Sequence, residues 1–242
     1  MSVEPRYLRL TEETNALDCL ERACIWLQEV EQDVMLWKWV ILALYGAVYG
    51  FAVSACRGTN PENVREKPQG KEPQYSEDEA SILAQVSLDP EVRRAASEEL
   101  EKYKKRRKKE DDERLLSFQK VIELSQNAAY VSNPLQLTDQ EKRSLDSLHK
   151  LRNKLVHYFP KLWSLELHYL PLMAKNVLRV IRFLALESNI YTCLEEGERA
   201  KVEKLIAQAL AAIEKSHLYV ETTLILEEGK PSARKVPDAG RD

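Results

Sequence analysis

The stretch WVILALYGAVYGFAVSAC, residues 39–56, contains eighteen consecutive positions without a charged side chain. A run of this length fits either the central helix of a soluble bundle or a membrane span, which needs about 20 apolar residues. Lys38 at its start, two tyrosines and Ser54 make it less hydrophobic than a typical span, and no second such run follows. We therefore expect a buried core helix, with a membrane helix as the alternative.

Gly46 and Gly50 form a GxxxG motif within this stretch. The spacing places both glycines on one side of a helix, where another backbone can approach closely. In a soluble chain we expect the motif to serve either close packing inside the core or the seam of a dimer.

Three further segments carry apolar side chains at steps of three and four residues, the pattern of a helix with one buried face: 12–33, 172–194 and 198–218. Hydrophobic residues make up 44% of the chain and charged ones 31%, with only 7 glycines, a mix that favours helices over a sheet with many turns. We expect an all-α fold with a single helical domain over 1–226 and a disordered tail over 227–242.

Two polar segments interrupt this pattern. Residues 57–79 hold three prolines and two glycines, so we expect a loop there. Residues 89–126 have a helical pattern that begins at Asp89-Pro90, and a helix so highly charged must project into solvent or bridge other elements. The alternative is contact with an RNA backbone through a basic cluster, although an acidic block follows it directly; the cluster comprises Lys104, Lys105, Arg106, Arg107, Lys108 and Lys109.

Charge and cysteine content limit the classes of function. The net charge of −3 gives the whole molecule no attraction for nucleic acid, so any such binding must come from a local patch. The four cysteines lack CxxC spacing, which argues against a zinc site or a disulfide framework. We see no Gly-rich phosphate loop, no HExxH motif and no apolar signal peptide at the N-terminus. We expect a cytoplasmic protein without metal or cofactor.

The segment 138–159 is predicted to form a helix with well-marked ends. Thr138 and Glu141 have the spacing of a capping box, in which each side chain bonds the backbone of the other. Pro160 cannot donate a backbone hydrogen bond and disfavours the α conformation of the residue before it, so the helix must end near Phe159.

Three polar residues stand in the last turns of this helix, within the sequence RNKLVHYFP: Arg152, Asn153 and His157. RNKLVH resembles the motif of the HEPN superfamily, in which an arginine, usually followed by a polar residue, precedes a histidine by four to six positions. The longer run LHKLRNKLVHYFPKLWSLELHYLP, residues 148–171, is similar to a plasmid-borne HEPN subfamily with an aromatic-Pro-Lys stretch, a Trp and a Leu-Pro after the motif. Arg143 and His149 also fit the bare spacing, but that pair lies in mid-helix.

The resemblance implies a bundle of four to five core helices, here with a long charged helical insert. It also implies a homodimer whose two motifs face each other, and, in active members, an endoribonuclease that needs no metal. RNA would be the substrate. A defence or toxin role, with a protein antitoxin or other protein as a candidate partner, follows from the family.

The residue types suit this chemistry. Cleaving RNA through its own 2′-OH needs a base, an acid for the leaving oxygen and positive charge on the transition state. His157 lies near a helix C-terminus, where the dipole favours an imidazolium, and Arg152 can hold a phosphate through two parallel N–H bonds. Asn153 would orient one of them or the phosphate.

Helical geometry leaves an alternative open. Positions five apart on a helix point about 140° from each other, so in a catalytic site Arg152 must reach around the helix or complete the site of a second subunit.

In the alternative without catalysis, Arg152 pairs with a carboxylate, Asn153 bonds locally and His157 fills a partly buried notch. The chain would then be a non-catalytic, dimeric module that binds RNA or a protein.

Overall fold

The computed structural model describes residues 8, 10–66, 77–87, 89–110, 114–157, 163–189 and 194–227. Within these ranges all regular structure is helical apart from one isolated β-bridge, which confirms the all-α prediction. The chain divides into two compact units, Met1–Asn63 with Phe118–Asp242, and Val64–Ser117.

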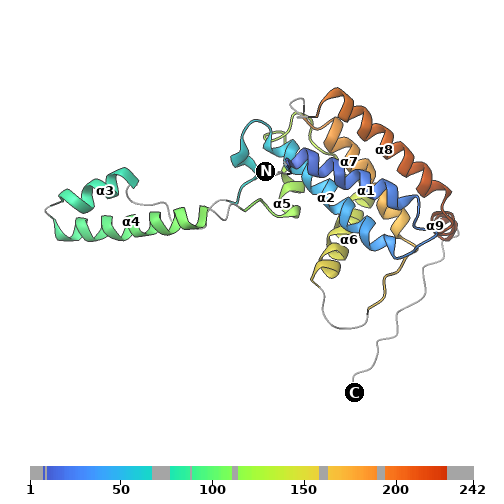
Figure 1. Ribbon diagram of the computed structural model, residues 1–242, viewed down its shortest axis with the longest axis horizontal. Coiled ribbons are helices and arrows are strands. Elements are labelled where there is room, and N and C mark those ends of the chain that lie inside the picture. The colour runs from blue at the N-terminus through green and yellow to red at the C-terminus, as the bar shows by residue number, and fades with distance from the viewer. Residues whose placement is uncertain are drawn as a thin grey trace, which may run out of the picture. The chain divides into compact units, whose positions relative to one another are not determined.

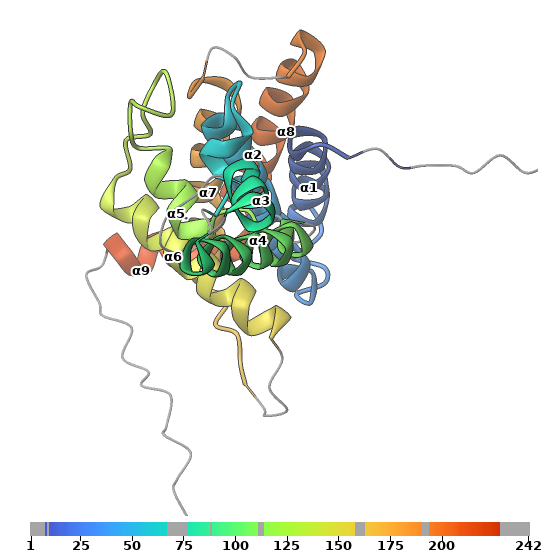
Figure 2. The ribbon, with the colours of Figure 1, turned by 90° about the vertical axis from the view of Figure 1, so that its left-hand side faces the viewer.

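The first unit is a helical bundle built around α2 (Figure 1). Its helices are α1 (Glu12–Leu27), α2 (Leu36–Arg57), α5 (Phe118–Leu124), α6 (Asp139–Val156), α7 (Leu170–Leu186), α8 (Glu196–Lys215) and α9 (His217–Glu227). Helix α2 packs against α1, α5, α6 and α7, while α8 covers α1 and α7 (Figure 2). The uncharged stretch thus lies where the most apolar surface can be buried.

Burial along α2 accounts for the absence of charges in its sequence. Val40, Ile41, Leu44 and Val48 are completely buried, and Phe51 is 2% exposed. Each such side chain contributes about 1.5–3 kcal/mol of burial free energy. Of the described helices, α2 alone is long and apolar enough to cross a membrane, and 67% of its most apolar window lies inside the bundle.

The GxxxG motif of α2 serves close packing against α1. A Cβ atom added to Gly50 would lie 2.8 Å from the Cβ of Ala16 and 3.0 Å from the carbonyl oxygen of Glu12. A Cβ added to Gly46 would lie 2.7 Å from the Sγ of Cys19. The expected close packing inside the core is therefore confirmed, and a use in a dimer seam stays a prediction.

A polar cluster joins the N-terminus of α1 to the C-terminus of α2. Glu13 is only 5% exposed, and its Oε1 accepts hydrogen bonds from Ser54 Oγ and Arg57 Nη2, both at 2.7 Å. Arg57 Nη1 donates to Glu12 Oε2 at 2.9 Å. Burial alone would raise the pKa of Glu13, but hydrogen bonds from Ser54, the backbone and Thr11, together with the charge of Arg57, lower it below its ordinary value.

The second unit is a pair of packed helices, α3 (Glu77–Val86) and α4 (Pro90–Glu110). The Asp89 carboxylate accepts a hydrogen bond from the backbone N–H of Glu91 at 2.9 Å, so the predicted N-terminus of this helix is confirmed. An antiparallel bridge between Arg65 and Leu115 holds the two ends of the unit together.

Several predicted boundaries differ from the structure. The prediction of one helix over 89–126 is wrong, because α4 ends at Glu110 and α5 begins only at Phe118. Backbone bonds from Glu66 N–H to the Arg114 carbonyl and from Leu116 N–H to the Val64 carbonyl hold residues 114–116 in a bridge instead of a helix. The predicted 57–79 loop contains a 3₁₀ turn, Pro61–Val64, and the first residues of α3. Helices α1 and α7 end earlier than predicted, at Leu27 and Leu186. The tail beyond Glu227 lies outside the described residues.

Helix α6 begins as predicted and ends slightly earlier. Thr138 Oγ1 accepts from the Glu141 N–H at 3.2 Å, and Glu141 Oε2 accepts from the Thr138 N–H at 2.9 Å, which confirms the capping box. The last helical residue is Val156, and His157 is the C-cap, with its N–H bonded to the Asn153 carbonyl at 2.9 Å. Pro160 and its neighbours from 158 to 162 lie outside the described residues.

Candidate functional site

Arg152 is half-buried near the C-terminus of α6, and its guanidinium has two partners. Nη1 donates to Asn153 Oδ1 at 3.0 Å. The guanidinium carbon lies 4.9 Å from the centroid of the Tyr45 ring on α2, within the range of a cation–π interaction. The two contacts restrict the rotamers of a side chain that would otherwise be flexible.

Asn153 connects Arg152 to His149. Its Nδ2 lies 3.1 Å from His149 Nε2. Because Oδ1 accepts from Arg152, the amide NH₂ faces the histidine and makes Nε2 the acceptor. The neutral ring then carries its proton on Nδ1, which is buried and has no hydrogen-bond partner among the described residues.

Aromatic rings from two other helices, α2 and α5, contact His149. Its ring stacks on Phe118 of α5, with centroids 5.3 Å apart and planes at 15°, and on Tyr45, at 5.9 Å and 29°. Tyr45 and Phe118 stack on each other at 4.7 Å. Burial raises the pKa of Tyr45, and this effect outweighs the opposing charge of Arg152. We call Arg152, Asn153, His149, Tyr45 and Phe118 the arginine cluster.

His157 does not belong to the arginine cluster. Its imidazole is exposed and takes part in no hydrogen bond or ion pair within the described part of the chain; only its backbone N–H is bonded, to the Asn153 carbonyl. The five-residue spacing already turns it about 140° from Arg152, and the helix ends just before it. The structure therefore brings Arg152 and Asn153 together and leaves His157 apart from them; the predicted catalytic roles of all three stay predictions.

Two members of the arginine cluster had no signal in the sequence. Tyr45 and Phe118 lie far from the motif along the chain and join it only through the packing of α2 and α5 on α6. His149 precedes Asn153 by four positions, a spacing that puts both on one face of a helix and could have indicated their contact. In the sequence, His149 stands out only because its spacing from Arg143 also fits the motif.

The basic cluster predicted to touch RNA lies on α4. Its backbone is helical from Lys104 to Lys109, but its side chains lie outside the described residues. Contact with RNA there stays a prediction.

As for metals, the described residues contain no group of three or more His, Cys, Asp or Glu side chains arranged to hold an ion.

No protein-family model, curated protein or solved structure significantly matches this chain.

Proposed function

We propose that this chain is a HEPN-like, metal-independent endoribonuclease that uses Arg152, Asn153 and His157. The observation that carries the proposal is the way Arg152 is held. One of its five N–H groups bonds to Asn153 and its face lies against Tyr45, so the remaining donors are pre-oriented and still able to bind a phosphate. A guanidinium fixed in this way can stabilise charge in a transition state without first being ordered.

In this proposal His157 moves the protons. As a base it takes the proton from the 2′-OH of the RNA; the 2′ oxygen attacks phosphorus and the bond from phosphorus to the 5′ oxygen breaks. An imidazolium gives a proton to that leaving oxygen. The products are a 2′,3′-cyclic phosphate and a 5′-OH end, with Arg152 neutralising the extra charge on the phosphoryl oxygens as the new bond forms.

The separation of Arg152 from His157 favours a dimeric site. Within one chain the two side chains point in different directions, so His157 of a second copy would have to approach Arg152 of the first. A two-fold dimer that brings the ends of both α6 helices together would supply two histidines, one as base and one as acid. The resemblance to HEPN proteins implies the same arrangement.

A second candidate function also has an observation in its favour. Arg152, Asn153 and His149 form a continuous hydrogen-bonded chain whose role could be purely structural. The protein would then be a non-catalytic, dimeric HEPN-like module that binds RNA or a protein partner.

Cleavage of labelled RNA by the purified protein in EDTA distinguishes the two. We expect the wild type to cut and leave 2′,3′-cyclic phosphate ends, and both His157→Ala and Arg152→Ala to be inactive while remaining folded by circular dichroism. His217→Ala, which removes an exposed histidine from the start of α9, is the matched control and should cut normally. No cutting by the wild type, or equal cutting by all variants, would support the binding module.

A further inference from the structure

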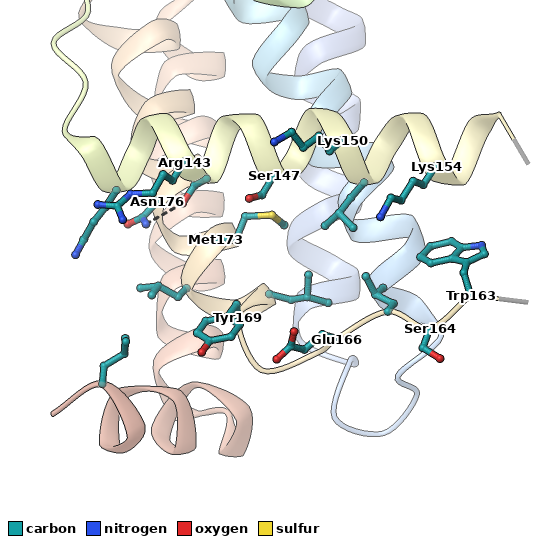
Figure 3. A pocket seen from close by; sticks show the side chains of 17 residues that line it. Arg143, Ser147, Lys150, Lys154, Trp163, Ser164, Glu166, Tyr169, Met173 and Asn176 are labelled. Atoms are coloured by element: carbon teal, nitrogen blue, oxygen red, sulfur yellow. Dashed lines mark hydrogen bonds between the residues drawn. The ribbon is translucent and has the colours of Figure 1, made fainter. Parts of the chain in front are cut away.

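A pocket of about 630 Å³ lies beside α6 (Figure 3). None of the five residues of the arginine cluster lines it. One wall is α6; the opposite wall is the segment from Trp163 to Tyr169 and the start of α7. Its volume falls within the range of pockets that bind small ligands, roughly 300–1,000 Å³. Lys150 and Lys154 flank Arg152 in sequence but point about 160° away from it around the helix.

Three cations line the pocket from α6: Arg143, Lys150 and Lys154. They are seven and four positions apart, so they lie within about 40° of one another and form a stripe along one face. No ion pair within the described part of the chain involves any of the three. Glu166 is the one carboxylate among the described lining residues. The lining therefore carries an excess of positive charge.

The rest of the lining is suited to a planar apolar group. Leu170 and Met173 are buried and form part of the floor. Trp163 is half-buried and lies at the same end of the pocket as Lys154, and Tyr169, further along, is 39% exposed (Figure 3). Aromatic faces beside a row of cations are the features that bind bases and phosphates of single-stranded nucleic acid.

We propose that this pocket binds a single-stranded segment of the RNA substrate, with phosphates along Arg143, Lys150 and Lys154 and a base against Trp163. The inference rests on the proposed function for the identity of the substrate. The stripe rises about 16 Å along the helix, which exceeds the reach of one phosphate and fits consecutive nucleotides better than a free one. Lys154 precedes His157 by only three positions, so a strand leaving at that end passes the C-terminus of α6.

Binding of a short fluorescein-labelled single-stranded RNA to the His157→Ala protein in EDTA tests the proposal without cleavage. We expect the double variant Lys150→Gln/Lys154→Gln to bind at least about tenfold more weakly. The slope of log affinity against log salt should fall from about −2, for three phosphate contacts, to about −0.7 for one. Trp163→Ala should weaken binding about fivefold or more through loss of stacking.

The matched control is Lys204→Gln/Lys215→Gln, which removes the same charge from exposed positions on α8 and should bind normally. Equal affinities for both double variants would overturn the proposal and place RNA contact elsewhere, for instance on the basic cluster of α4. Displacement of the RNA by AMP at the same nucleotide concentration would overturn it in favour of a free nucleotide. Failure of the wild type to cleave RNA would instead count against the proposed nuclease and leave this binding test intact.

Discussion

The guanidinium of Arg152 and the ring of Tyr45, 4.9 Å apart, connect the C-terminal turns of α6 to the middle of the core helix α2. Tyr45 also stacks on Phe118 of α5 and on His149 of α6, so its ring contacts both neighbouring helices. The position of Arg152 thus depends on the packing of the bundle as well as on its own helix.

Replacing Tyr45 with leucine should destabilise the protein by about 1.5–3 kcal/mol. The substitution removes the cation–π contact and the stacked pairs, each of which contributes roughly 0.5–1.5 kcal/mol. Tyr45→Phe keeps the ring and should cost less than about 1 kcal/mol. Urea denaturation followed by circular dichroism measures both; equal losses would show that the hydroxyl, and not the ring, matters.

Gly50→Ala should destabilise the protein by about 1–3 kcal/mol. The added methyl group would lie 2.8 Å from the Cβ of Ala16 and 3.0 Å from the Glu12 carbonyl, so α1 and α2 must separate. Gly197→Ala on α8 is the matched control, because nothing lies within 4 Å of its added methyl, and it should be neutral or stabilising by up to about 1 kcal/mol. Similar melting temperatures for the two variants would contradict the packing role of the motif.

The parts of this fold that local signals determine could be predicted from sequence. The core helix at 39–56 and the capping box of Thr138 and Glu141 follow from patterns within a few residues. The break between α4 and α5 could not, because it depends on backbone bonds to Val64 and Glu66, about fifty positions earlier. Tyr45 and Phe118 could not be predicted as site residues for the same reason, because they reach Arg152 and His149 only through the packing of helices distant in sequence.

The pH dependence of stability should contain a contribution from Glu13. Its pKa is lower in the folded state than the ordinary value of 4.5, so the stabilisation is fully present above that value and is lost as pH falls through the folded pKa. Glu13→Gln should therefore be less stable than the wild type at neutral pH, by about 1–3 kcal/mol since Arg57 loses a buried partner, and the gap should narrow in acid. Urea unfolding at several pH values measures this gap. Glu123→Gln removes only an exposed pair with Lys120 and should cost at most about 1 kcal/mol.

Cys24 and Cys56 should be inert toward thiol reagents in the folded protein. Both are completely buried, and burial raises the pKa of each to about 12, so almost no thiolate is present at neutral pH. Modification with a maleimide, mapped by peptide mass spectrometry, should label them only after denaturation. Rapid labelling of either in the native protein would contradict the packing of α1 and α2.

If Arg152 acts on the phosphate, Asn153 should matter to catalysis as a positioning residue. Asn153→Ala removes the acceptor that orients Arg152 Nη1 and should lower kcat about tenfold or more, with a smaller change in KM, because a mobile guanidinium still binds phosphate but is no longer ordered for the transition state. Asn153→Asp keeps an acceptor for Arg152 but places a negative charge beside the phosphate, so it should raise KM as well. Steady-state kinetics on labelled RNA separate the two effects, with His217→Ala as the unaffected control. Wild-type kinetics in both Asn153 variants would mean that the hydrogen-bonded chain from Arg152 to His149 serves the fold alone.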